Sequence, residues 1–178
     1  MEEILTEVWQ LEDREAVVDR IMDLYGQDIL HLVYSYVKDQ TTAEDLTQEI
    51  FIKCYKNLHQ YNRKAKLKTW LWRIAVNHCK DYLKSWHSRN MMVADEQART
   101  EASHREDVEN LVIQMEEDEK LAAAVMGLPE IYREVIYLYF FEELAIKEIA
   151  YAASLNQNTV KTRLKRAKEL LKERLEDR

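Results

Sequence analysis

Glycine and proline are nearly absent from this chain, which has two Gly and one Pro among 178 residues. These two residues make most tight turns, because glycine reaches left-handed backbone angles and proline fixes φ at a turn position. Apolar residues instead recur at helical spacing along most of the sequence. The sequence therefore predicts an all-α fold, in which long helices are joined by polar connections.

The first half of the chain predicts four helices in a domain that covers residues 1–86. Apolar stripes and breaks place these helices at Glu12 to Tyr25–Gly26, at Ile29 to Tyr36, from Thr41/Thr42 to Leu58 and at about Leu67 to Trp86. Thr41 and Thr42 each stand three residues before an acid, which is the spacing of a capping box at the start of a helix. A polar and basic loop around Tyr61–Asn62 separates the last two helices.

The second half predicts another helical domain, over residues 116–178, that ends in a helix-turn-helix. Its helices are expected before Gly127–Leu128–Pro129, from Tyr132 to Tyr139, over Ile146–Ala153 and over Gln157–Leu175. Ala150, Ser154 and Val160 supply the small residue, the turn residue and the apolar anchor that this motif requires. Asn156 is the expected N-cap of the last helix.

Positive charge is concentrated in two blocks of a chain whose net charge is −7. Residues 61–89 carry eight Lys/Arg against one acid, and residues 156–178 carry eight against four. The rest of the chain holds ten Lys/Arg against twenty-eight Asp/Glu. Residues 87–115, between the predicted domains, are interpreted as an acidic linker. A surface that repels phosphate except in two places is typical of a protein that contacts nucleic acid at two sites.

The last helix of each domain is predicted to present a cationic face. On the helix from Leu67, two apolar arcs include His78 and Trp70, the latter mainly in the core, and one polar window remains. The window holds Thr69, Arg73, Asn77, Lys80 and Lys84. On the final helix, the residues expected to point inward are Val160, Leu164, Ala167, Leu171 and Leu175. Those expected to point outward in its first turns are Thr159, Lys161, Thr162, Arg163, Lys165 and Arg166.

No constellation in the sequence supports catalysis or a bound cofactor. The chain has no glycine-rich phosphate loop, nucleophile elbow or histidine pair at metal spacing, so no catalytic residue, metal ligand or cofactor is expected. Cys54 and Cys79 are expected to be reduced, partly buried thiols. No stretch is apolar for long enough to cross a bilayer, and no signal peptide is evident. We expect a cytosolic, non-enzymatic protein without direct membrane insertion.

These residues resemble the extracytoplasmic-function (group IV) family of bacterial RNA polymerase sigma factors. The segments that carry the resemblance are Ala43–Phe51 (AEDLTQEIF), Thr69–Asn77 (TWLWRIAVN), Leu128–Pro129–Glu130, Tyr132–Val135, Glu148–Ala150 and Thr159–Ala167. The order and the distances between these segments make the resemblance specific over most of the chain, from about Asp19 to Leu175. One departure is Asn158, which stands where the family usually has glycine.

The resemblance implies a region-two domain and a region-four domain that bind core RNA polymerase and promoter DNA. It implies that the β′ clamp coiled coil is bound by Glu44, Asp45, Gln48 and Glu49. It implies that the melted −10 element is held by Tyr61, Asn62, Arg63, Lys64, Arg73, Asn77, Lys80 and Lys84. It implies that the −35 element is read by Asn158, Thr159, Lys161, Thr162, Arg163, Lys165 and Arg166. The helices with Tyr132 and Phe140 are then expected to meet the β flap, and an anti-sigma factor, often membrane-anchored in this family, to regulate the protein.

Other interpretations of these features stay open at this point. The acids near Thr42 also fit a helix-capping cluster, and the acidic linker fits either a phosphate mimic in the polymerase channel or a plain tether. For the whole chain, the alternatives are an autonomous helix-turn-helix regulator and a pure interaction protein. A basic and aromatic block suited to single strands is unnecessary for such a regulator, and an adaptor would leave the cations of Lys161–Arg166 without a purpose.

Overall fold

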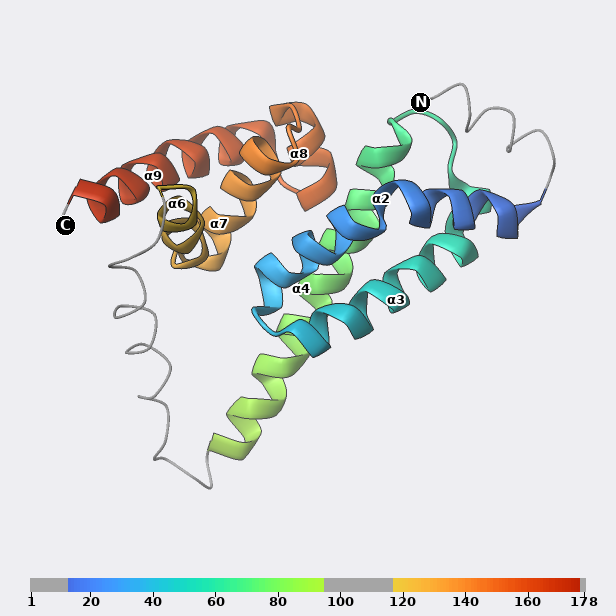
Figure 1. The fold of residues 1–178 in the computed structure, drawn as a ribbon, viewed down its shortest axis with the longest axis horizontal. Coiled ribbons are helices and arrows are strands. Elements are labelled where there is room, and N and C mark those ends of the chain that lie inside the picture. The colour runs from blue at the N-terminus through green and yellow to red at the C-terminus, as the bar shows by residue number, and fades with distance from the viewer. Residues whose placement is uncertain (1–12, 95–116, 177–178) are drawn as a thin grey trace. The chain divides into compact units, whose positions relative to one another are not determined.

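The structure is a computed structural model that describes residues 13–94 and 117–176. The expected helix start near Glu12 and most of the expected linker, residues 95–115, lie outside the described residues. Every secondary-structure element within the described ranges is a helix, which confirms the all-α prediction (Figure 1). None of these described helices combines the length and the apolar character needed to span a membrane.

The described helices form two compact units. The first half of the chain contains α2 (Arg14–Val37), α3 (Gln40–Asn57), the short 3₁₀ helix η1 (Leu58–Gln60) and α4 (Leu67–Ala94). The second half contains α6 (Glu117–Met126), α7 (Glu130–Ile136), the π-helical segment η3 (Tyr137–Phe141), α8 (Ile146–Ala153) and α9 (Gln157–Glu176). Helices α2 and α3 and the first part of α4 belong to one unit, and α6, α7 and α9 belong to the other.

A single helix, α2, replaces the two helices that the sequence predicted before Tyr36. The predicted break at Tyr25–Gly26 is wrong, because α2 continues through both residues. Glycine inside a helix costs about 1 kcal/mol relative to alanine, and the full burial of Ile21 and Ile29 on either side offsets that cost. The helix ends instead at Lys38, which takes left-handed angles (φ 57°).

Helix α3 is capped by Asp39 and not by the predicted threonines. The Asp39 carboxylate accepts a hydrogen bond from the backbone N–H of Thr42 at 2.8 Å. Hydrogen bonds from Thr42, with its side chain contributing most, lower the pKa of Asp39 below its usual value. The capping-box prediction for Thr41 and Thr42 is therefore wrong. The left-handed turn at Lys38 starts the helix earlier and leaves both threonines inside its first turn.

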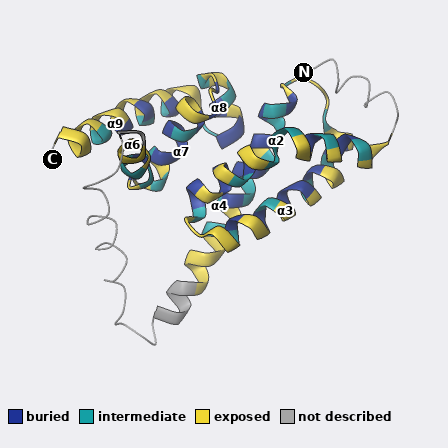
Figure 2. Ribbon diagram, viewed as in Figure 1, coloured by how far each residue is buried: buried dark blue, intermediate teal, exposed yellow. Residues whose placement is uncertain are grey.

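The core of the first unit lies between α2, α3 and α4. Leu32, Ile50 and Trp72, one from each of these helices, are fully buried. Helix α2 packs along α3, and the buried residues of both helices line their shared side (Figures 1 and 2). Cys54 and Cys79 are free thiols in this core and are more deeply buried than predicted. Burial raises the pKa of Cys54 to about 12, which keeps that thiol protonated near neutral pH.

Helix α4 differs from the prediction in its length and at two side chains. It continues past Trp86 to Ala94, because no Gly or Pro interrupts this stretch. Thr69, which the helical wheel placed in the polar window, is 2% exposed and lies outside the outward face. Trp70, predicted to lie mainly in the core, is half-buried. A wheel gives the angle of a side chain around the axis, whereas the neighbours at that level of the helix decide how far it is covered.

The connection between α6 and α7 is fixed by a buried arginine. Helix α6 ends directly before Gly127–Leu128–Pro129, as predicted. Arg133, which is 6% exposed, donates from Nη1 to the backbone carbonyl oxygens of Met126 and Leu128, each at 3.1 Å. These bonds satisfy carbonyl groups that the end of a helix leaves without partners. This role of Arg133 was not predicted from the sequence.

The helix-turn-helix segment agrees closely with its prediction. Helix α8 has the predicted bounds, and α9 ends one residue beyond the expected Leu175. The Asn156 side chain caps α9 by accepting from the N–H of Thr159 at 2.7 Å, and Ser154 takes the left-handed turn conformation (φ 57°). Val160 is fully buried, as expected for the anchor. Leu175 is 47% exposed, so its predicted inward position is wrong.

Candidate functional site

The acidic residues of α3 lie together on its outward face. Glu44, Asp45, Gln48 and Glu49 are all exposed. Two large apolar side chains continue the same face toward the end of the helix, Ile52 at 53% and Tyr55 at 40% exposure. Neither residue was predicted from the sequence, although Ile52 follows Glu49 by three positions and Tyr55 follows Ile52 by three, which is the spacing of one helix face. The face combines negative charge with exposed apolar surface.

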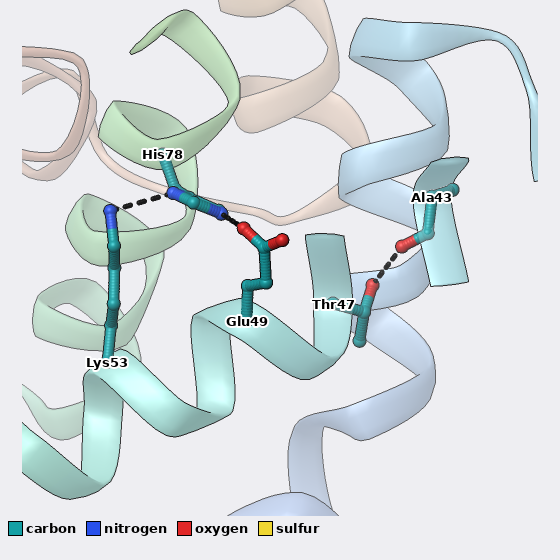
Figure 3. A network of polar contacts seen from close by, with 5 residues as sticks. All are labelled: Ala43, Thr47, Glu49, Lys53 and His78. Atoms are coloured by element: carbon teal, nitrogen blue, oxygen red, sulfur yellow. Dashed lines mark hydrogen bonds and ion pairs between the residues drawn. The ribbon is translucent and has the colours of Figure 1, made fainter. Parts of the chain in front are cut away.

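A histidine of α4 joins this face from the side. His78 Nε2 lies 2.7 Å from Glu49 Oε2, and His78 Nδ1 lies 2.8 Å from Lys53 Nζ (Figure 3). The His78 side chain is 11% exposed and that of Glu49 is 57% exposed. The prediction that His78 belongs to an apolar arc is therefore wrong. The helical wheel placed it correctly toward α3 but could not show that polar groups of α3 meet it there.

The basic loop before α4 combines an aromatic pair with exposed polar groups. The rings of Tyr61 and Trp70 lie 5.2 Å apart at an interplanar angle of 45°. The Tyr61 hydroxyl donates to the carbonyl oxygen of Ala65 at 2.8 Å, a hydrogen bond that closes the loop on itself. Asn62 and Lys64 are exposed, and the side chain of Asn62 accepts from the N–H of Lys64 at 3.1 Å.

A second local feature of this loop is the backbone of Arg63. This exposed residue has φ 60°, a left-handed conformation that is uncommon outside glycine. With Asn62 and Lys64 on either side, Arg63 forms the exposed corner of the loop. The three residues are consecutive in the chain, and their shared role in binding the −10 element stays a prediction.

The polar window on α4 keeps four of its five predicted members. Arg73 and Lys84 are exposed, and Asn77 and Lys80 are partly exposed. Their spacing of four, three and four residues keeps all of them on one side of the helix. Thr69 is buried and therefore does not belong to the exposed window.

The residues of α9 that were predicted to point outward differ in solvent exposure. Asn158, Lys161, Thr162, Lys165 and Arg166 are exposed, whereas Thr159 and Arg163 are partly buried. This difference separates two arginines that the sequence analysis treated alike.

Both of these arginines form ion pairs, but with different surroundings. Arg163 Nη1 lies 3.6 Å from Glu134 Oε2 of α7, and that carboxylate side chain is only 3% exposed. Arg166 is bonded to Glu169 at 3.1 Å and lies 3.6 Å from Glu173, all on the exposed side of α9. The hydrogen bond to Glu169, and then the charge of Glu173, raise the pKa of Arg166. Arg163 is thus tied to α7, and Arg166 stays at the surface.

A further surface, on the second unit, is aromatic and was only partly predicted from the sequence. Phe140 and Phe141 of η3 are 53% and 50% exposed, and Ile131 of α7 is 45% exposed. Tyr132, the other residue predicted here, is partly buried. Lys168 of α9 lies 5.4 Å from the Phe140 ring centroid, within cation–π range.

The residues in the described ranges give no cluster of three or more His, Cys, Asp or Glu side chains placed to hold a metal ion.

Comparison with known proteins agrees with the division into two helical units. The Sigma-70 region 2 family matches residues 21–89, and the Sigma-70, region 4 family matches residues 118–171. The ECF RNA polymerase sigma factor SigM of Bacillus subtilis is 32% identical over 155 residues, which cover 87% of this chain and 93% of SigM. The chain belongs to the ECF family of RNA polymerase sigma factors. As a member of this family, it is an alternative sigma factor.

Other relatives of this sigma factor show the same extent of similarity. The ECF RNA polymerase sigma factor SigW of Bacillus subtilis is 33% identical over 172 residues, covering 93% of this chain and 91% of SigW. Among solved structures, the sigma factor RpoE from Bartonella quintana, crystallised with the anti-sigma factor NepR, has a TM-score of 0.70 at 20% identity and covers 89% of this chain and 96% of RpoE. This structural likeness supports the fold of the sigma factor.

The ion pair between Arg163 and Glu134 gives a prediction about the stability of this sigma factor. Arg163→Ala removes a partner of a buried carboxylate, so we expect the free energy of unfolding to fall by about 1–3 kcal/mol. Lys165→Ala, which changes an exposed residue two positions further along, is the matched control and should change it by less than about 0.5 kcal/mol. Urea unfolding of both variants measures the difference. Equal stability of the two would show that the pair does not stabilise α7 against α9.

Proposed function

We propose that this sigma factor contacts its partners through separate surfaces of its two helical units and has no catalytic activity of its own. The outward face of α3 binds core RNA polymerase at the β′ clamp coiled coil. The loop 61–64 and the polar window of α4 hold the melted −10 strand, and the first turns of α9 read the −35 element. The observation that carries this proposal is the distribution of exposed charge, since the acids lie on α3 and the cations on the loop, α4 and α9.

The α3 face is suited to a basic protein partner with an apolar centre. Glu44, Asp45 and Glu49 repel nucleic acid but attract Lys and Arg side chains. Exposed Ile52 and Tyr55 beside them supply apolar area that a partner can cover. Charges of this kind speed association and select the partner, while apolar burial supplies most of the affinity.

The loop before α4 is suited to an unstacked base. Single-strand recognition combines cations, which hold the backbone, with aromatic faces and amides, which hold the base. Tyr61 and Trp70 supply the rings, Asn62 supplies an exposed amide, and Arg73 and Lys84 supply charge along α4. These groups are the reason to assign single-strand binding to this unit.

The start of α9 is suited to the major groove. Its exposed cations are Lys161, Lys165 and Arg166, and exposed Thr162 lies between them. Arg163, held by Glu134, supports the orientation of α9 and has a smaller part in base reading. Asn158 stands at the helix start without the freedom of a glycine, and we assign it to the contact with the DNA backbone.

The aromatic surface of η3 is assigned to the β flap. Phe140 and Phe141 present two rings to solvent, and exposed aromatic side chains are enriched where proteins bind each other. Tyr132 of α7, which is partly buried, is assigned to the same contact.

Control by an anti-sigma factor is the remaining part of the proposal. The RpoE of Bartonella quintana was solved with the anti-sigma factor NepR, and CnrH with the cytosolic domain of CnrY. We extend this kind of regulation to the present chain, because exposed apolar surface on α3 and η3 can be covered by such a partner while polymerase is absent. An autonomous helix-turn-helix regulator needs none of the α3 surface.

The polymerase-binding assignment is tested by reversing charge on α3. We expect the double variant Asp45→Lys/Glu49→Lys to bind core polymerase at least about tenfold more weakly, because like charges then face a basic partner. Both residues are exposed, so the fold should survive the change. Fluorescence anisotropy of labelled protein with core polymerase measures the affinity. The matched control is Asp19→Lys/Asp23→Lys on α2, which should bind as the parent does. If the α3 variant binds as tightly as the parent, the assignment of polymerase binding to α3 is wrong.

The −10 assignment predicts a preference for melted DNA. Asn62→Ala and Asn77→Ala should reduce open-complex formation more than closed-complex binding, because their partner bases are exposed only after melting. A promoter with a premelted −10 bubble should show the loss in binding directly. Equal losses on duplex DNA without a −10 sequence would indicate general attraction to phosphate and contradict base capture.

The −35 assignment predicts two kinds of variant on α9. Arg166→Ala should relax the preference for one −35 base pair at least about fivefold if it reads a guanine edge. Lys161→Ala and Lys165→Ala should weaken all sequences alike and lower the salt slope by about one unit if they contact phosphate. Holoenzyme binding to a series of −35 variants at several salt concentrations separates these effects. If none of the three changes affinity or base preference, α9 does not read the promoter.

A further inference from the structure

Glu49 and Lys53 of α3 stand four residues apart, with the acid nearer the N-terminus. This spacing and order favour a direct ion pair along a helix. In the structure each side chain instead contacts His78 of α4, Glu49 Oε2 at Nε2 (2.7 Å) and Lys53 Nζ at Nδ1 (2.8 Å). Figure 3 shows the imidazole ring between the two side chains. A residue of α4 therefore separates a carboxylate and an ammonium that α3 alone would bring together.

The contacts define the form of the imidazole. An ammonium group has hydrogen-bond donors and no acceptor, so Nδ1 of His78 must accept from Lys53. Nε2 then carries the ring hydrogen and donates it to the Glu49 carboxylate. This ring is neutral, and it orients Glu49 without cancelling the negative charge of the carboxylate.

The position of the network connects it to the α3 face. The Glu49 side chain stays 57% exposed while bonded, whereas the His78 side chain is 11% exposed. His78 thus acts from the side of the face and leaves the carboxylate accessible. A partner that binds the α3 face meets Glu49 and not the imidazole.

We propose that His78 is a positioning residue that keeps Lys53 away from Glu49 and so preserves the negative charge of the polymerase-binding face. This inference rests on the proposed binding of polymerase by α3. Without the ring, Lys53 is free to swing to Glu49 and to pair with it along the helix. The pair shields one of the few carboxylates on which the attraction of the face for a basic partner depends.

The test is a double-mutant cycle between His78 and Lys53, with the affinity of the full-length protein for core polymerase as the readout. His78→Leu should weaken binding about two- to fivefold, which is the range expected for one exposed ion pair. In a Lys53→Met background the same change should have no effect, because no ammonium remains to cover Glu49. His78→Gln, whose amide can donate to Glu49 and accept from Lys53, should bind as the parent does.

Two controls distinguish a loss of electrostatic attraction from misfolding as the cause of weaker polymerase binding. His31→Leu changes an exposed histidine of α2 that bonds Gln27 in the same helix, and it should leave polymerase binding unchanged. The loss caused by His78→Leu should also shrink at high salt, because an exposed ion pair is screened, whereas a misfolded domain would stay impaired.

Two results have different consequences for the proposals. If Glu49→Gln binds polymerase as tightly as the parent, the assignment of Glu49 to the polymerase-binding face is wrong, and so is the positioning role of His78. If Glu49→Gln weakens binding but His78→Leu costs the same with Lys53 and with Met at that position, the face assignment stands. Only the positioning role of His78 is then overturned.

Discussion

Each helix face described for this sigma factor depends on the burial of the opposite side of its helix. Helix α3 presents its acids outward because Leu46, Ile50 and Cys54 are buried on its other side. Helix α9 presents its cations because Val160, Leu164 and Ala167 are buried. The hydrophobic effect has no direction of its own, but on a helix it fixes the rotation about the axis and so decides which polar side chains reach a partner.

Hydrogen bonds and ion pairs then determine which charged side chains of these faces stay exposed. The ring of His78 contacts Glu49 while leaving the carboxylate exposed, and the ion pair between Arg163 and Glu134 connects α9 to α7. Arg166 keeps its place at the surface, where Glu169 and Glu173 share its charge. A protein of net charge −7 can therefore present cations to DNA only at particular places, and nearby acids moderate even those.

The division into separate helical units suits a subunit that contacts several partners at once. Each unit has a buried core of its own, so binding at one face need not disturb the packing of the other. The exposed apolar residues beside the charged ones, Ile52 and Tyr55 on α3 and Phe140 and Phe141 on η3, mark where such partners can bury area. A regulator that covers the same residues would compete with polymerase, which fits the proposed control by an anti-sigma factor.

The sequence by itself determined the all-α class, the bounds of α8, the cap at Asn156 and the cationic faces of α4 and α9, because these follow from local periodicity and local hydrogen bonding. Only the tertiary structure decided the rest. Gly26 stays helical because burial on both sides of it offsets its poor propensity, and Thr69 is covered despite its polar position on the wheel. The roles of His78 and of Arg163 depend on Glu49, Lys53 and Glu134, which lie on other helices. A periodic pattern reports which side of a helix a residue occupies, whereas its partner across the interface is fixed only when the helices pack.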